Sequence, residues 1–154
     1  MNATTAITFP EVQQNGDNGE SEMVKRNTID SIAVQGILEN GATANYSFTS
    51  TTDAAPPRFE WIIVGEKGSL KLESPSPFIA MMPPTMSRYT PGEGAKWEEV
   101  EVASPMAFGG VGEVYSAFAE GKTDGLVDFE AAVVRHKMVD AIYRSAEKGT
   151  RESY

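Results

Sequence analysis

The chain has 154 residues, of which 40% are hydrophobic, and this is the size of one ordinary domain with a real core. Asp and Glu number 22 against 13 Lys and Arg, and the resulting net charge of -9, without a basic stripe, argues against nucleic acid as a partner. The absence of cysteine and the single histidine exclude disulfides, thiolate nucleophiles and metal sites built from cysteines or several histidines.

Nothing in the sequence indicates a membrane segment. No stretch approaches the roughly 20 apolar residues that a membrane span needs. The first residues, MNATTAITFPEV, contain no basic leader and no long apolar core. We therefore expect a cytoplasmic protein without a membrane partner.

The first third of the chain is predicted to form strands. Residues 4–9 are β-branched and aromatic and precede Pro10, which predicts a short strand near a sheet edge. The polar stretch QQNGDNGESE that follows predicts a mobile loop. Asn40 and Gly41 then separate two strand-like runs and predict a hairpin. If these two residues form the whole loop, Gln35 and Tyr46 share one face of the sheet.

The stretch WIIVGEKGSLKLE, residues 61–73, contains glycines, a lysine and a serine close together and so raises the question of a phosphate site. A P-loop has the pattern GxxxxGK[ST], in which the lysine and the hydroxyl residue follow the second glycine and open a helix. Here Lys67 precedes Gly68, and SLKLE alternates as a strand does. The stretch therefore predicts a hairpin turn between strands at 58–64 and 69–73.

Residues 75–95 hold five of the nine prolines and three of the seven methionines. Proline withholds a backbone donor, so this segment is predicted to be irregular, with at most two short strands near residues 78–82 and 86–90. Residues 96–102 predict a further strand. Its glutamates are typical of a solvated edge.

The last third changes from strand to helix periodicity. Apolar residues spaced i, i+3, i+4 and i+7 predict an amphipathic helix that ends near Gly121: Val111, Val114, Tyr115 and Phe118. The preceding GGVG lacks the full G-x-G-x-x-G pattern and no βαβ unit surrounds it, so we interpret it as the start of a helix. Strands followed by helices predict an α+β fold, an open and mostly antiparallel sheet with two C-terminal helices packed on one face.

A longer helix is predicted between Asp128 as its N-cap and Gly149 as its C′ residue. At about 100° per residue, one half of its circumference is apolar: Phe129, Ala131, Ala132, Met138, Val139, Ile142, Tyr143 and Ala146. Arg135 projects from the middle of this arc and His136 from its rim. Arg135 is therefore predicted to face the core.

Four segments together resemble one protein family. They are VKRNTIDSIAVQGILENGATANYSF, FEWIIVGEKGSLKLESP, GEVYSAFAEGK and DFEAAVVRHKMVDAIYRSAEKGTRESY. They resemble the C-terminal domain of the glucose-fructose oxidoreductase, inositol dehydrogenase and rhizopine-catabolism (Gfo/Idh/MocA) family, in its fungal galactose-repressor-like branch. The resemblance implies an open antiparallel sheet that packs on a nucleotide-binding domain in full-length members and often supplies a dimer interface.

The catalytic parts of that family have no counterpart in this sequence. Family members carry a Rossmann domain with a glycine fingerprint, a catalytic lysine, and an Asp and His near the start of the C-terminal domain. Residues 1–20 contain no lysine and no histidine, and His136 lies on the late helix instead. We therefore expect one domain over residues 1–154, without a nucleotide-binding domain, a cofactor or hydride transfer.

Several side chains are candidates for a site. His136 is the one histidine, the residue type whose unperturbed pKa lies near neutral pH, and it suits an acid or base, or else a structural hydrogen bond. Arg135 offers a planar fork of donors for a substrate carboxylate or enolate, or else pairs with a carboxylate such as Glu113. The predicted catalytic residues are Tyr46, Glu60 and His136. The predicted substrate-binding residues are Gln35, Trp61, Met82, Tyr89 and Arg135, which either line a pocket or pack the sheet.

Two functions of different classes remain open. The first is a stand-alone, cofactor-independent isomerase, cyclase or lyase of fungal specialised metabolism, in which Tyr46 or Gln35 polarises a carbonyl of a small-molecule substrate and Glu60 or His136 moves a proton. The alternative is a non-catalytic, repressor-like binding or dimerisation module. Both predict a homodimer formed through the sheet. A third possibility is a truncated paralogue without an independent role.

Overall fold

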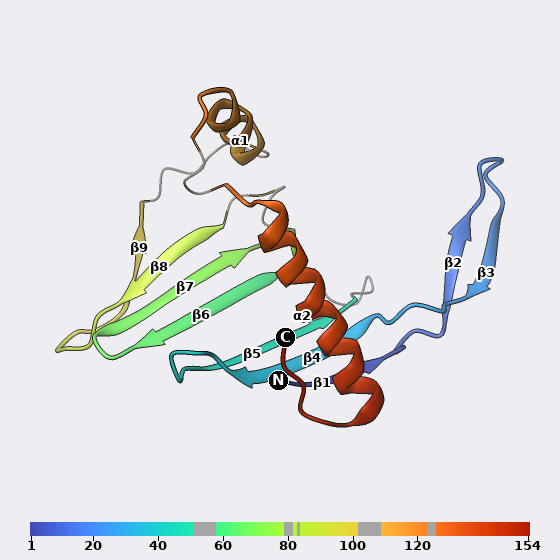
Figure 1. Ribbon diagram of the computed structural model, residues 1–154, viewed down its shortest axis with the longest axis horizontal. Coiled ribbons are helices and arrows are strands. Elements are labelled where there is room, and N and C mark those ends of the chain that lie inside the picture. Colours follow the sequence, from blue (N-terminus) through green and yellow to red (C-terminus); the bar gives the residue numbers. More distant parts are fainter. Residues whose placement is uncertain (51–57, 79–81, 83, 102–108, 123–125) are drawn as a thin grey trace. The chain divides into compact units, whose positions relative to one another are not determined.

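The structure is a computed structural model, shown in Figure 1, and it describes residues 1–50, 58–78, 82, 84–101, 109–122 and 126–154. The described strands are all paired in antiparallel fashion and two helices follow them, so the predicted α+β class is confirmed. Backbone contacts divide the chain into two compact units, residues 1–50 with 127–154 and residues 51–126. None of the described helices is both long and apolar enough to cross a membrane.

The main sheet of the first unit has three strands in the order β1-β4-β5. Their bounds are β1 (Asn2–Ala6), β4 (Ser31–Ile37) and β5 (Thr43–Thr49). The helix α2 (Phe129–Lys148) packs against β1 and crosses one face of this sheet (Figure 1). Partly buried residues alternate with exposed ones along β1 and β4, because side chains point alternately to the two faces and α2 covers only one.

The turn between β4 and β5 is one residue longer than predicted. The Leu38 N–H donates to the Ala42 C=O at 2.8 Å, and the Gly41 N–H donates to the Leu38 C=O at 2.9 Å. Gly41 has a φ of 86°, which is the left-handed region, and the Asn40 carboxamide accepts from the Ala42 N–H at 3.1 Å. This is a three-residue loop that ends in a left-handed glycine.

The longer turn changes which side chains share a face. Tyr46 lies opposite Val34, and Gln35 lies opposite Asn45. The predicted pairing of Gln35 with Tyr46 is therefore wrong, because a shift of one residue moves every side chain to the other face.

Residues 11–25 form a hairpin, so the predicted loop in this region is wrong. The strands β2 (Glu11–Asn15) and β3 (Ser21–Lys25) pair along their whole length. The tip closes through hydrogen bonds from the Gly16 N–H to the Glu20 C=O at 2.8 Å and from the Gly19 N–H to the Gly16 C=O at 3.0 Å. The glycines that suggested a loop supply the tight turn of this hairpin.

Asp30 ties the base of the β2–β3 hairpin to the main sheet. Its carboxylate accepts from the backbone N–H groups of Thr8 at 2.6 Å and Phe9 at 2.8 Å, and it pairs with Arg26 at 3.0 Å. Burial raises the pKa of the Asp30 carboxyl, but the Thr8 and Phe9 N–H groups, the Thr8 hydroxyl and Arg26 together outweigh it, so the pKa lies below its usual value. The carboxylate is held in its charged form.

The ends of α2 match the prediction. The Asp128 carboxylate accepts from the Ala131 N–H at 2.8 Å as the N-cap. At the other end Gly149 has a φ of 65°, and its N–H donates to the Ser145 C=O at 2.9 Å.

The face that α2 buries differs from the predicted apolar arc. Ala141 and Ser145 are its buried residues, with Met138 and Ile142 partly buried beside them. Arg135 is exposed, so the prediction that it faces the core is wrong. The buried residues of α2 are small, and this lets the helix lie close to β1. Ser145 accepts a hydrogen bond from the Ala3 N–H at 2.9 Å.

The second unit contains a four-stranded sheet in the order β6-β7-β8-β9 and the helix α1 (Gly109–Ala119). The strand bounds are β6 (Phe59–Gly65), β7 (Gly68–Ser74), β8 (Thr85–Tyr89) and β9 (Trp97–Val100). The strands predicted at 58–64, 69–73, 86–90 and 96–102 thus appear with small shifts, although residue 102 lies outside the described residues. The strand suggested near 78–82 falls largely on residues 79–81, which also lie outside them.

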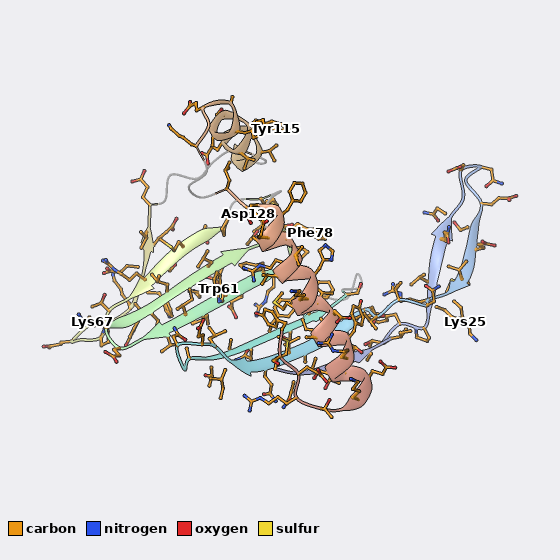
Figure 2. All side chains as sticks on the ribbon, in the orientation of Figure 1. Lys25, Trp61, Lys67, Phe78, Tyr115 and Asp128 are labelled. Atoms are coloured by element: carbon orange, nitrogen blue, oxygen red, sulfur yellow. The ribbon has the colours of Figure 1, made fainter. Side chains whose placement is uncertain are left out.

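The EKG segment is a turn, as predicted. Gly65 pairs with Gly68, and Lys67 lies between them at the end of the sheet (Figures 1 and 2). Gly68 has a φ of 152°, and a Cβ atom there would lie 2.3 Å from the Tyr89 carbonyl oxygen. Only glycine fits this approach of β7 to β8.

Helix α1 also matches the prediction. After its last residue, Gly121 has a φ of 69°, and the N–H groups of Gly121 and Lys122 donate to the carbonyls of Phe118 and Ala117 at 3.1 and 2.9 Å. This is the usual end of a helix at a left-handed glycine. Its apolar residues, including Tyr115 (Figure 2), are exposed within the described residues.

Candidate ligand-binding site

A cavity with a volume of about 740 Å³ lies in the first unit, against the main sheet and α2. We call it the α2 pocket. Its lining comes from β4, β5 and their turn, from α2, and from the chain ends: Met1, Ile32, Val34, Gln35, Gly36, Ile37, Leu38, Glu39, Ala44, Asn45, Tyr46, Met138, Ile142, Glu152, Ser153 and Tyr154. Most of these residues are apolar.

Strand alternation decides which of these residues direct side chains into the α2 pocket. Ile32, Val34 and Tyr46 share the face that α2 covers, together with Met138 and Ile142 of the helix. Gln35 and Asn45 pair on the opposite face, so they border the pocket through their backbone. Tyr46 is 58% exposed and offers the pocket an aromatic ring and a hydroxyl group.

The C-terminal residues are held in the pocket wall. The Glu152 N–H donates to the Met1 C=O at 2.9 Å, which sets the chain beside β1. Ser145 supports this segment, because its hydroxyl donates to the Thr150 C=O at 2.7 Å.

Glu152 is the one carboxylate of the pocket that has partners within the described residues. Its oxygens lie 3.1 Å from the Thr150 hydroxyl, 3.4 Å from the Arg144 Nε and 3.8 Å from the Lys148 Nζ. The Thr150 hydroxyl, followed by Arg144 and Lys148, lowers the pKa of the Glu152 carboxyl in spite of the opposing effect of burial. The negative charge of Glu152 therefore stabilises the C-terminal segment that forms part of the pocket wall.

Tyr46, one of the three predicted catalytic residues, lines the α2 pocket. His136 is exposed on α2 and does not line it, and Glu60 belongs to the second unit. His136 and Tyr46 therefore do not line the same pocket in the first unit.

The predicted substrate-binding residues fall in both units. Gln35 is one of the residues that line the α2 pocket, and Arg135 is exposed on α2. Trp61, Met82 and Tyr89 belong to the second unit. There, Trp61 on β6 (Figure 2) pairs with Leu72, whereas Tyr89 pairs with Ser69, so the two aromatic side chains lie on opposite faces of that sheet.

Tyr89 has a different aromatic neighbour from the one expected. Its ring lies 5.7 Å from that of Trp97, which pairs with it on β9. The Lys71 Nζ lies 5.2 Å from the Trp97 ring and 2.7 Å from the Glu73 carboxylate. This cluster packs one face of the second sheet.

The sequence interpretation missed several residues of the α2 pocket. Met138 and Ile142 are on the predicted apolar arc of the helix and could have been found from it. Glu39, Glu152 and Tyr154 carry no periodic signal, because they lie in a turn and a terminal segment. Among the described residues, no cluster of three or more His, Asp or Glu side chains could hold a metal ion.

Comparisons with known proteins identify the type of domain. Residues 1–74 match the family model of the Gal80p C-terminal domain. A relative, the dehydrogenase aclE of Aspergillus oryzae, is 43% identical over 110 residues, which are 71% of this chain and 28% of that protein. These findings support a C-terminal domain like that of the Gfo/Idh/MocA family. The resemblance inferred from the sequence is confirmed.

Solved structures support the fold of this Gfo/Idh/MocA-type domain. The transcriptional regulator Gal80p of Kluyveromyces lactis matches with a TM-score of 0.73 at 23% identity, over 97% of this chain and 38% of that one. A super-repressor mutant of Gal80p of Saccharomyces cerevisiae matches with a TM-score of 0.69 at 20% identity, over 97% and 42%. The chain therefore spans less than half the length of these proteins.

Proposed function

We propose that this chain is the small-molecule-binding domain of a Gfo/Idh/MocA-type protein, and that it binds a mostly apolar organic molecule in the α2 pocket. The observation that carries this proposal is the pocket itself, whose volume of about 740 Å³ falls within the range of about 300–1,000 Å³ found for small-molecule sites. Its walls are apolar, and Tyr46 adds one aromatic ring with a polar end.

The name of a similar protein supports binding of an organic substrate by this domain. The relative from Aspergillus oryzae is named a dehydrogenase. The lining of the α2 pocket contains no Lys, Arg or His side chain, so it suits the phosphates of a dinucleotide poorly. The pocket therefore fits an organic substrate better than a nicotinamide cofactor.

A cofactor-independent isomerase, cyclase or lyase is the second candidate. The observation in its favour is the Tyr46 phenol in the pocket wall, which can donate a hydrogen bond to a carbonyl oxygen. Within the first unit, His136 does not line this wall, so a proton-moving partner from that unit has to be Glu39, the ligand itself or water. Binding is thus better supported than catalysis.

A non-catalytic, repressor-like module is the third candidate, and it would use the same pocket only to bind a small molecule. Two similar structures are named a transcriptional regulator and a super-repressor mutant. A regulator of this kind would bind the small molecule and release it unchanged.

Ligand capture tests the proposal. The purified chain is loaded with the small-molecule extract of the cells that make it, washed, and analysed by mass spectrometry. We expect one compound to be retained by the wild type and by Tyr89→Ala, a matched control in the other unit, and to be lost from Tyr46→Ala. Equal retention by Tyr46→Ala would refute the pocket as the site.

The same experiment separates binding from catalysis. The retained compound is incubated with the chain in the absence of nicotinamide cofactors, and its mass and chromatographic position are followed. A converted product that Tyr46→Phe fails to form supports the cofactor-independent enzyme. An unchanged compound supports the binding domain.

We also propose that two copies associate through a sheet face. On the second unit, Trp61, Ile63 and Leu70 are exposed on one face of the sheet, with Trp61 55% exposed. Burying such side chains against a second copy is favourable. We expect light scattering to give a dimer for the wild type and a monomer for Trp61→Glu, whereas a monomeric wild type would contradict this.

A further inference from the structure

The charged side chains of the α2 pocket are both acidic. They are Glu39 and Glu152, and no basic side chain lines the pocket. The α-amino group of Met1, which is also in the lining, already donates to the Glu152 C=O. An anionic ligand would be repelled by both carboxylates and would find no basic side chain to pair with. The side chains of the pocket therefore disfavour an anionic ligand.

The two carboxylates differ in what they contact. Glu152 is already paired with Arg144, Lys148 and the Thr150 hydroxyl. Glu39 makes no ion pair and no side-chain hydrogen bond with any other residue that the structure describes. Glu39 is thus the carboxylate with capacity left for a ligand.

Glu39 has a fixed place at one end of the pocket. It sits in the three-residue β4–β5 turn, whose backbone is closed by the Leu38–Ala42 and Gly41–Leu38 hydrogen bonds at 2.8 and 2.9 Å. Glu39 also lines an adjoining open recess of about 370 Å³ with Leu38 and Asn40. It therefore stands where the apolar pocket meets solvent.

We propose, resting on the ligand-binding function proposed above, that the molecule in the α2 pocket carries a basic nitrogen that is cationic at neutral pH. Its apolar body lies against Val34, Tyr46 and Met138. Its cationic nitrogen pairs with the Glu39 carboxylate at the turn. Next to apolar walls such a pair is screened less than a pair in open solvent.

The overall charge of the chain has to be separated from this local effect. With a net charge of -9, the chain attracts any cation weakly and without a defined site. Glu66 is a matched control, because it is an exposed glutamate in another glycine-containing hairpin turn, between β6 and β7. Glu39→Gln and Glu66→Gln change the net charge by the same amount.

The experiment uses three probes that share an indole ring and differ in charge: tryptamine, 3-ethylindole and indole-3-propionate. Their dissociation constants are measured by NMR titration of the wild type, Glu39→Gln, Glu66→Gln and Tyr46→Ala. We expect tryptamine to bind most tightly and indole-3-propionate most weakly. Glu39→Gln should weaken tryptamine by about two- to fivefold, as expected for one partly exposed charge pair, and leave 3-ethylindole unchanged.

The outcomes separate this inference from the proposed function. If 3-ethylindole binds and Tyr46→Ala weakens it, but Glu39→Gln and Glu66→Gln affect tryptamine equally, the pocket binds ligands and the cationic class is wrong. Preferential binding of indole-3-propionate would also overturn the cationic class. If none of the probes binds, or if binding is insensitive to Tyr46→Ala, the proposed function fails and the inference with it.

Discussion

Tyr46 of β5 lies directly opposite Val34 of β4, on the face of the sheet that α2 crosses. This pairing follows from the three residues in the turn between the strands. With a two-residue turn, Tyr46 would point to the other face and the α2 pocket would lose the Tyr46 ring. The length of one turn thus decides whether Tyr46 lines the proposed ligand site.

Replacing Asp30 should destabilise the first unit more than replacing any exposed acidic residue. Its side chain is 1% exposed and accepts from Thr8 and Phe9 while pairing with Arg26. Asp30→Ala leaves these donors without a partner, so we expect a larger fall of the urea midpoint than for Asp30→Asn, which keeps one acceptor oxygen. Asp17→Asn, at the exposed hairpin tip, is the control and should not change the midpoint.

The same carboxylate predicts an acid-sensitive stability. The pKa of Asp30 is lower in the folded chain than in the unfolded chain, so the unfolded chain binds more protons as the pH falls. This contribution is fully present above the unfolded value of about 4 and is lost as the pH falls towards the folded pKa. Glu152 acts in the same direction. Urea unfolding between pH 7 and 3 should show a smaller acid-induced loss for Asp30→Asn than for the wild type, and equal losses would contradict this.

Ser145 links three segments of the first unit. It is 1% exposed, accepts from the Ala3 N–H and donates to the Thr150 C=O. Ser145→Ala leaves the Ala3 N–H and the Thr150 C=O, both in partly buried hydrogen bonds, without this partner and should lower the free energy of unfolding by about 1–3 kcal/mol. Ser116→Ala, on the exposed helix α1, serves as the control. An effect of Ser145→Ala no larger than that of Ser116→Ala would show that these bonds contribute nothing.

Gly68 is the glycine whose replacement should cost most. Gly68→Ala places a Cβ atom 2.3 Å from the Tyr89 carbonyl oxygen in a left-handed backbone region, so we expect a loss of about 1–3 kcal/mol from backbone strain, plus the clash. Gly112→Ala is the opposite case, since it lies within α1 with open space around it and should stabilise the helix by about 0.5–1 kcal/mol. Thermal unfolding of both variants checks the contrast, and equal effects would contradict it.

The elements that were predictable depend on local chemistry. The N-cap at Asp128, the C′ glycine at Gly149 and the tight turn at Gly68 are determined by neighbouring residues, and the sequence indicates each of them. The β2–β3 hairpin was missed because its glycines suit a loop and a hairpin tip equally well.

The site was harder to predict because it depends on register and on tertiary packing. Asn40 and Gly41 indicate a hairpin, yet they do not tell a two-residue loop from a three-residue loop, and that difference moved Gln35 to the other face. The helix arc suggested that Arg135 is buried, whereas α2 turns its small residues to the sheet. Tyr154 enters the pocket wall only because the chain returns to the start of β1.

Methyl NMR of the chain titrated with 3-ethylindole tests the central claim most directly. The account predicts saturable shifts of the methyl groups of Ile32, Met138 and Ile142, which line the α2 pocket, with no change at Ile63 and Leu70 in the other sheet. Shifts confined to Ile63 and Leu70, or no saturable shift at any methyl group, would contradict a ligand site beneath α2.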